Sequence, residues 1–242
     1  MVYEGAINFR PVGTATGLAA QFYRSGDLAG VQASAATAIY NRLGVRSFID
    51  LRSEAEVIRY GEPVELTRQG VDWVRSPISG YSGEPIRHAS ASAADYARYY
   101  LDLLESSSMA LVNSLTVIAD RCEEPVVFGC HAGKDRTGLL SIVLLEIAGA
   151  TRDEIRDDYA ASTQALQVSI DNFSDKWQRR GLDRQVYATR LTAHPETIDA
   201  FYTLLGGSQL VEILSQRGFA ADRRLRLVKA LVRHRPSNRR VV

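Results

Sequence analysis

Three short apolar runs in the first 130 residues predict buried β-strands. Residues 45–51 are rich in β-branched and aromatic side chains, which favour an extended backbone. Residues 71–74 alternate apolar and polar positions and stop shortly before Pro77. Residues 125–128 form an apolar run that leads, through one glycine, into Cys130. The pattern therefore predicts at least three strands, the last of which delivers a cysteine at its carboxyl end.

Helical periodicity occupies the segments between these runs. Apolar residues recur at helical spacing in residues 34–43, 93–104 and 109–121. The segment 137–145 is apolar on nearly all sides, which predicts a buried central helix. Thr151 begins a further helix, because Glu154 stands three residues later and completes a capping box. Helical patterns then continue to about residue 232.

Strands that alternate with helices predict an α/β fold with a central, mostly parallel sheet flanked by helices and a helical C-terminal part. No linker divides the pattern, so we expect one domain over residues 1–232. Residues 233–242 are basic and contain a proline, and we expect them to form a flexible tail.

Composition narrows the class of protein and of partner. Apolar residues make up 45% and charged residues 24% of the chain, as in ordinary globular proteins. The net charge of +1 argues against a nucleic-acid partner. Two cysteines cannot form a disulfide framework, which favours a reducing, cytoplasmic location. The longest apolar run, residues 139–150, is too short and too polar for stable membrane insertion. The sequence contains no indication of oligomeric state.

The segment from Cys130 to Arg136 carries the clearest chemical pattern. A strand delivers the cysteine, five residues follow, and an arginine stands where the next helix begins. Such a loop can curl into a nest of backbone N–H groups around a tetrahedral phosphate, and Gly133 permits the backbone angles of the curl. The helix N-terminus adds partial positive charge, and the Arg136 guanidinium can bind two phosphate oxygens. The same surroundings favour a thiolate at Cys130.

These groups predict a two-step phosphoryl transfer through a phosphocysteine intermediate, with no metal and no cofactor. Cys130 attacks phosphorus, water then hydrolyses the intermediate, and Arg136 with the loop amides stabilises charge in both steps. Thr137 is a candidate donor of a hydrogen bond to the sulfur. The leaving oxygen also needs a proton. Asp135 in the loop is the first candidate for this general acid, followed by Asp50 at a strand end and Asp95 upstream of the cysteine.

The segment Cys130–Gly138 resembles the Cys-x5-Arg-Ser/Thr motif of the cysteine-based protein tyrosine phosphatase superfamily. The string Cys-x-Ala-Gly-Lys-Asp-Arg-Thr-Gly is similar to one bacterial branch of tyrosine and dual-specificity phosphatases, some of which also hydrolyse phosphoinositides. Further similar segments cover most of the chain: residues 8–10, 22–28, 43–53, 158–162 and 195–196.

The resemblance implies roles for individual residues. Cys130 corresponds to the nucleophile, Arg136 to the phosphate clamp and Asp135 to a loop aspartate that this branch uses as the acid. Lys134 corresponds to a lysine linked to broad or lipid-type specificity, and Asp50 and Arg52 to positions bordering the pocket. The full set of predicted substrate-binding residues is His131, Ala132, Gly133, Lys134, Thr137, Gly138, Asp50 and Arg52.

The chain also departs from the superfamily. Gly129 stands where a histidine usually precedes the cysteine, and His131 follows the cysteine as a candidate source of positive charge. A nucleotide-binding P-loop is rejected, because only three residues separate Gly129 from Gly133 and Asp135 follows the lysine. A sulfur-transfer loop is disfavoured by the arginine and threonine at the helix start.

The sequence therefore predicts a phosphomonoesterase that acts on phosphotyrosine or phosphoproteins. The alternative is a phosphatase of a small metabolite such as a nucleoside, sugar or inositol phosphate, and a further alternative is a non-catalytic phosphate-binding module. A phosphate-binding loop recognises the phosphate itself, so it does not separate these substrates.

Overall fold

The computed structural model describes residues 3–13, 21–79 and 91–232. The basic segment 233–242 lies outside the described residues. Within the described residues, a five-stranded sheet has the order β1-β2-β5-β3-β4, in which β2, β5, β3 and β4 are parallel and β1 is antiparallel to β2. Its strands are β1 Arg10–Pro11, β2 Phe22–Ser25, β3 Ser47–Asp50, β4 Asp72–Arg75 and β5 Val126–Gly129. The predicted mostly parallel sheet is confirmed.

Helices account for most of the remaining described chain. Their bounds are α1 Ala33–Asn41, α2 Glu54–Tyr60, α3 Val64–Arg68, α4 Ala93–Arg121, α5 Asp135–Ile147, α6 Arg152–Val168, the 3-10 helix η1 Ile170–Phe173, α7 Ser174–Arg179, α8 Arg184–Leu191, α9 Glu196–Leu204, α10 Leu210–Gln216 and α11 Ala221–Val232. Within the described ranges, no helix is both long enough and apolar enough to cross a membrane.

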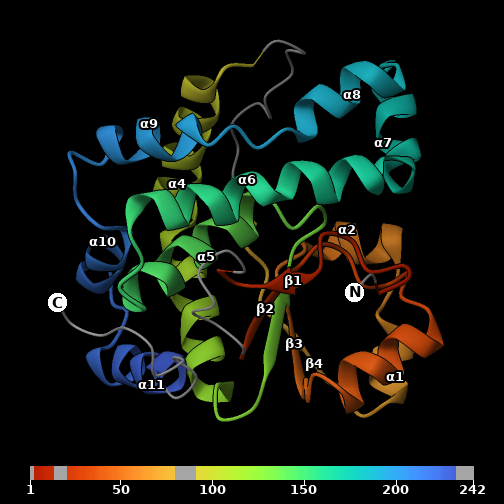
Figure 1. Ribbon diagram of the computed structural model, residues 1–242, viewed down its shortest axis with the longest axis horizontal. Coiled ribbons are helices and arrows are strands. Elements are labelled where there is room, and N and C mark those ends of the chain that lie inside the picture. Colours follow the sequence, from red (N-terminus) through yellow and green to blue (C-terminus); the bar gives the residue numbers. More distant parts are fainter. Residues whose placement is uncertain (1–2, 14–20, 80–90, 233–242) are drawn as a thin grey trace, which may run out of the picture.

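The alternation of side chains along the strands explains the layers. Phe48 of β3 and Val127 of β5 face a core shared with α1, whereas Ile49 and Phe128 face the larger core shared with α4 and α5. In Figure 1, α1 accordingly lies on one side of the strands and α4 and α5 lie on the other. Both faces of the sheet are covered, as expected for a parallel sheet.

The structure corrects two details of the predicted elements. The segments 93–104 and 109–121 form one helix, α4, with a kink at Ser107, whose φ and ψ are −126° and 20°. Strands β1 and β2 were not predicted from the pattern, because β1 has only two residues and β2 contains the polar pair Arg24 and Ser25. Both polar side chains of β2 are buried.

Cys122 lies at the end of α4, before β5, and Cys130 lies directly after β5. The two cysteines therefore flank β5 in the sequence, and both are buried.

Candidate active site

The loop from Cys130 to Lys134 joins the carboxyl end of β5 to the first residue of α5, Asp135. Because β5 is in the middle of the sheet, the loop lies beside the carboxyl ends of its parallel neighbours, β2 and β3. Thr137, in the first turn of α5, accepts a hydrogen bond from the backbone N–H of Cys130 at 2.9 Å. This contact ties the loop to the helix and assigns Thr137 a positioning role.

The carbonyl groups of the loop are bonded on its outer side. The His131 carbonyl accepts from the backbone N–H of Asp27 at 2.9 Å. The Gly133 carbonyl accepts from the side chains of Asn8 at 2.9 Å and Arg24 at 2.8 Å. In a planar peptide the N–H of the next residue points the opposite way, so these contacts turn the following N–H groups inward. An inward ring of N–H donors is the nest that an anion requires.

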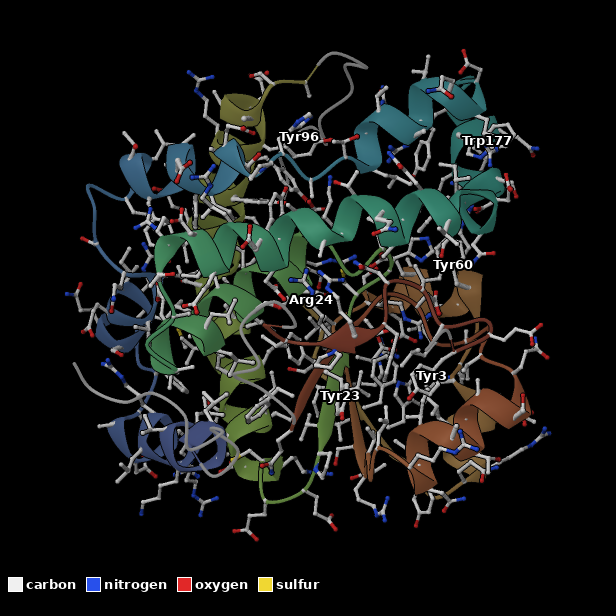
Figure 2. The ribbon with its side chains drawn as sticks, in the orientation of Figure 1. Tyr3, Tyr23, Arg24, Tyr60, Tyr96 and Trp177 are labelled. Atoms are coloured by element: carbon white, nitrogen blue, oxygen red, sulfur yellow. The ribbon has the colours of Figure 1, made fainter. Side chains whose placement is uncertain are left out.

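A buried ion pair beneath the loop holds Arg24, the side chain that donates to the Gly133 carbonyl. Arg24 of β2 pairs with the carboxylate of Asp158, and both side chains are buried. Figure 2 shows Arg24 beneath α6, the helix that contributes Asp158. Arg10 reaches the backbone carbonyl of Asp158 at 2.8 Å. The resembling segments around residues 8–10, 22–28 and 158–162 thus converge under the loop and support it.

Three glycines allow the loop to approach β2 this closely. A Cβ on Gly129 would lie 2.7 Å from the Ser25 carbonyl oxygen, and one on Gly133 would lie 2.5 Å from the backbone N of Gly26. Gly133 also has a φ of 70°, as its predicted role requires. A Cβ on Gly26 would in turn lie 2.8 Å from the His131 oxygen. The departure at residue 129 therefore has a steric reason, because this packing leaves no room for a histidine.

The Arg136 guanidinium is oriented by Glu56, a residue that the sequence analysis missed. Its Nη1 and Nη2 each donate to one carboxylate oxygen of Glu56 at 2.7 Å, and Nη1 also donates to the Leu51 carbonyl at 3.2 Å. Glu56 also caps α2 by accepting from the backbone N–H of Ser53 at 2.8 Å. The Ser-x-x-Glu spacing predicts such a helix cap, but only the fold shows that the cap faces the arginine.

The ion pair between Glu56 and Arg136 shifts the pKa values of the two groups in opposite directions. Burial would raise the pKa of Glu56, but the hydrogen bonds and charge of Arg136 lower it to about 2. Burial would lower the pKa of Arg136, but the charges of Cys130 and Glu56 raise it above the ordinary value. Both groups are therefore ionised at neutral pH, and the cation is fixed next to the cysteine.

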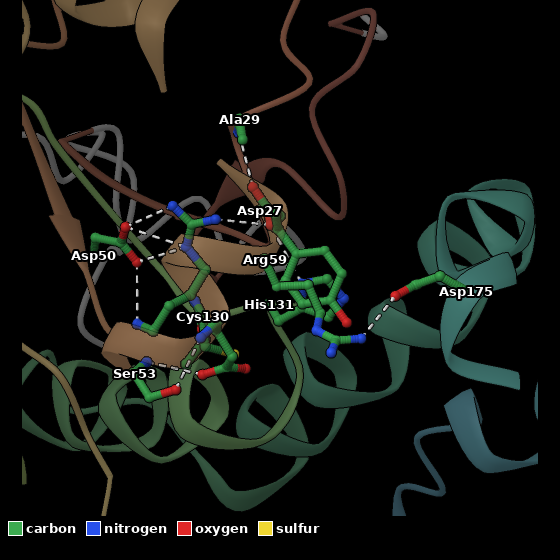
Figure 3. A network of polar contacts seen from close by, with 12 residues as sticks. Asp27, Ala29, Asp50, Ser53, Arg59, Cys130, His131 and Asp175 are labelled. Atoms are coloured by element: carbon green, nitrogen blue, oxygen red, sulfur yellow. Dashed lines mark hydrogen bonds and ion pairs between the residues drawn. The ribbon is translucent and has the colours of Figure 1, made fainter. Parts of the chain in front are cut away.

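Asp50 and Arg52 do not border the cavity, contrary to the prediction. Both side chains are fully buried, and the Asp50 carboxylate accepts from Arg52 and from Trp73 Nε1 at 3.0 Å. Arg52 also donates to Asp27 at 2.8 Å, and Asp27 lies 3.3 Å from His131 Nδ1 (Figure 3). The two residues therefore support the loop through Asp27 and His131 without direct access to a substrate.

His131 lines the cavity but does not supply positive charge. Its ring stacks on Tyr60 with centroids 4.0 Å apart, and it is almost completely buried. Burial lowers the pKa of the imidazole below its ordinary value, despite the hydrogen bond with Asp27. The ring is neutral at pH 7, so the expectation that it adds charge beside the cysteine is wrong.

Lys134 connects the loop to the carboxyl end of α8. Its Nζ donates to the Arg190 carbonyl at 2.9 Å and lies 4.2 Å from the centre of the Tyr96 ring. It also reaches the Thr192 carbonyl at 3.4 Å and lies 3.8 Å from Asp135 Oδ1. The lysine lines the cavity, but its donors hold the carboxyl end of α8 against the loop.

Cys130 and Arg136 open onto a cavity of about 190 Å³, which Ala132 and Asp135 also line. Cys130 is only 3% exposed, so its sulfur lies at the floor of the cavity. Of the three candidate acids, only Asp135 is at the cavity, because Asp50 is buried in the sheet and Asp95 caps α4 through Ser92. Gly133, Thr137 and Gly138 form the supporting layer and do not line it.

Aromatic and basic side chains from distant segments complete the walls of the cavity. The tyrosines are Tyr96, Tyr99 and Tyr187, and the cations beyond the loop are Lys176, Arg180 and Arg190. Figure 2 shows Tyr96 near the top of the molecule, and Trp177, which follows Lys176 on α7, above Tyr60. Burial lowers the pKa of Lys176 to about 8; the charge of Glu56 opposes this shift, and the charges of Arg136 and Arg180 add to it. These residues are not predictable from the sequence, because no local motif links α4, α7 and α8 to the cysteine.

Comparisons with known proteins identify the family of this chain. The model of the tyrosine phosphatase family matches residues 1–208. The triple specificity protein phosphatase PtpB of Mycobacterium tuberculosis is 30% identical over 257 residues, covering 84% of this chain and 90% of PtpB. A tyrosine-protein phosphatase of Nostoc commune is 32% identical over 127 residues, covering 52% of this chain and 42% of its own. Among solved structures, the catalytic core of the PP-IP phosphatase SIW14 from S. cerevisiae is 20% identical, with 64% of this chain and 75% of that chain covered and a TM-score of 0.41.

Proposed function

Because the chain belongs to the tyrosine phosphatase family, we propose that it hydrolyses phosphate monoesters through a phosphocysteine at Cys130. One observation carries the proposal. The sulfur lies at the floor of a cavity whose loop carbonyls are bonded outward, while Glu56 holds the Arg136 guanidinium beside it. Such an arrangement binds a phosphoryl group and places a nucleophile beneath it.

In the first step, the Cys130 thiolate forms a bond to phosphorus as the bond to the leaving oxygen breaks. Asp135 Oδ2 supplies the proton of the leaving group. In the second step, water attacks phosphorus, gives its proton to Asp135 and releases the sulfur. Arg136 and the loop N–H groups receive the negative charge of the transferred group in both steps. All of these groups belong to this chain, and the reaction as written uses no metal and no cofactor.

Phosphotyrosine is the substrate that the walls favour. Tyr96, Tyr99 and Tyr187 supply flat apolar faces above the cysteine, against which an aromatic leaving group can pack. PtpB is described as a triple specificity protein phosphatase, which supports a phosphorylated protein as the partner. The cytoplasmic location inferred from the cysteine content is part of the same proposal.

A second candidate class is a small metabolite with more than one phosphate, such as an inositol phosphate. Lys176, Arg180 and Arg190 line the cavity beyond the loop that binds the transferred phosphate. A second anionic group on the substrate would neutralise these cations.

Turnover of p-nitrophenyl phosphate by the purified protein, in the presence of a chelator, tests the chemistry. We expect turnover that vanadate inhibits and that Cys130→Ser abolishes, while Cys122→Ser at the far end of β5 retains it. A protein that binds phosphate but shows no turnover is instead a non-catalytic phosphate-binding module. Phosphotyrosine peptides and inositol phosphates, compared by kcat/KM, then separate the two substrate classes.

A further inference from the structure

The two oxygens of the Asp135 carboxylate have different surroundings. The Tyr100 hydroxyl donates to Oδ1 at 2.7 Å, and Lys134 Nζ lies 3.8 Å from the same oxygen. Both contacts of this carboxylate with described side chains thus go to Oδ1. The side chain is 27% exposed and lines the cavity, so Oδ2 is the oxygen left for a substrate.

A second tyrosine fixes the direction of the Tyr100 hydroxyl. The hydroxyls of Tyr100 and Tyr159 lie 2.7 Å apart, and both side chains are buried. A hydroxyl has one proton, and Tyr100 uses it on Asp135, so Tyr159 is the donor of the pair. The resulting chain runs from α6 through α4 to the first residue of α5: Tyr159 to Tyr100 to Asp135.

Packing holds the Tyr100 ring in this position. The ring meets Tyr159 edge to face with centroids 6.0 Å apart, and meets Phe201 in the same way at 6.1 Å. Burial, followed by the charge of Asp135, raises the pKa of Tyr100 well above its ordinary value. The hydroxyl therefore keeps its proton at neutral pH and remains a donor.

We propose that Tyr100 is a positioning residue for the general acid, which confines the transferable proton of Asp135 to Oδ2. A proton on Oδ1 would face the Tyr100 hydroxyl and break its hydrogen bond, whereas a proton on Oδ2 leaves that bond intact. In the first step the proton passes from Oδ2 to the leaving oxygen, and in the second step Oδ2 receives the proton of the attacking water. The inference rests on the proposed function of Asp135.

The test compares two substrates that differ in their need for an acid. Phenyl phosphate releases phenol, whose pKa is about 10 as for tyrosine, and depends on protonation of the leaving oxygen. p-Nitrophenyl phosphate releases a much more acidic phenol and depends on it little. For Tyr100→Phe we expect kcat/KM to fall about tenfold more for phenyl phosphate than for p-nitrophenyl phosphate. This loss is smaller than the roughly 10²- to 10⁴-fold contribution of a general acid, because the variant retains Asp135.

Two further variants make the result specific. Asp135→Asn should show the same selective loss with a larger magnitude. Tyr202→Phe is the matched control, because it removes a buried tyrosine hydroxyl that donates to a different carboxylate, Glu146, away from the cavity. We expect it to leave the ratio of the two substrates at the wild-type value. A purely structural role of Tyr100 would instead lower both kcat/KM values equally.

The outcomes separate the inference from the function beneath it. If Asp135→Asn is selective and Tyr100→Phe is not, Tyr100 does not position the acid. If neither variant is selective, Asp135 is not the acid, and if the wild type turns over neither substrate, the proposed function itself fails. Should Tyr100→Phe not fold, Tyr159→Phe keeps Tyr100 in place and must show a smaller loss of the same selectivity; an unchanged ratio overturns the inference.

Discussion

The pair formed by Glu56 and Arg136 yields the most quantitative prediction. Glu56→Gln keeps the shape of the side chain and one acceptor oxygen but removes the charge. The pKa of Glu56 falls from 4.5 to about 2 in the folded protein, which corresponds to about 3–4 kcal/mol of stability at about 1.4 kcal/mol per pKa unit. The two side chains are 18% and 21% exposed, so solvent screening reduces this to about 2–3 kcal/mol.

The pH dependence of this effect has a defined sign. A carboxyl whose pKa is lowered on folding contributes stability that is complete above its unfolded value of 4.5 and is lost as the pH falls toward about 2. We therefore expect the free energy of unfolding of the wild type to exceed that of Glu56→Gln by about 2–3 kcal/mol at pH 7, and the gap to narrow below pH 4.5.

Urea unfolding of both proteins at pH 7, 5, 4 and 3 measures this gap, and kcat/KM measures the loss of arginine alignment, which we expect to be at least about tenfold. Glu54→Gln is the matched control, because Glu54 lies on the same helix with its side chain 76% exposed and should change stability by less than about 1 kcal/mol. A gap that is the same at pH 7 and pH 3 would refute the ionic coupling of Glu56 to Arg136.

Three further predictions follow from the supporting layer and the walls. Gly129→Ala places a Cβ 2.7 Å from a backbone oxygen, and we expect urea unfolding to show about 1–3 kcal/mol of destabilisation. Gly30→Ala is the control, because its Cβ would have its nearest neighbour at 3.8 Å and should cost less than about 1 kcal/mol. Equal effects of the two substitutions would contradict the packing argument. Lys134→Met removes the donor to the Arg190 carbonyl, so hydrogen exchange across α8 should accelerate, and unchanged protection would show that the lysine does not hold this helix. Lys176 has a pKa of about 8, so KM for a substrate with a second phosphate should rise as the pH passes 8; this inflection should be absent in Lys176→Met, and its persistence there would assign it to another group.

The loop illustrates what local sequence determines. The order strand, cysteine, five residues, arginine and helix is contiguous, and each step has a local physical cause in strand propensity, the positive φ of Gly133 or the helix start. The alternation of strands and helices similarly predicts covered sheet faces and hence a mostly parallel sheet. These features depend on neighbours along the chain, so the sequence alone predicts them.

Asp50 and Glu56 illustrate what only the tertiary structure decided. Both are acidic residues near the end of β3, yet one is buried in an ion pair with Arg52 and the other clamps Arg136. The fold brings together residues that are far apart in the sequence: Glu56 contacts Arg136, and Tyr100 contacts Asp135. Lys176 likewise reaches the cavity from a distant helix. The role of such a carboxylate, hydroxyl or ammonium depends on the partner that packing gives it. The sequence by itself thus determined the candidate phosphate-binding loop, because the loop is local. The fold decided which distant residues pair with Arg136, contact Asp135 and line the cavity, because those contacts depend on how helices pack.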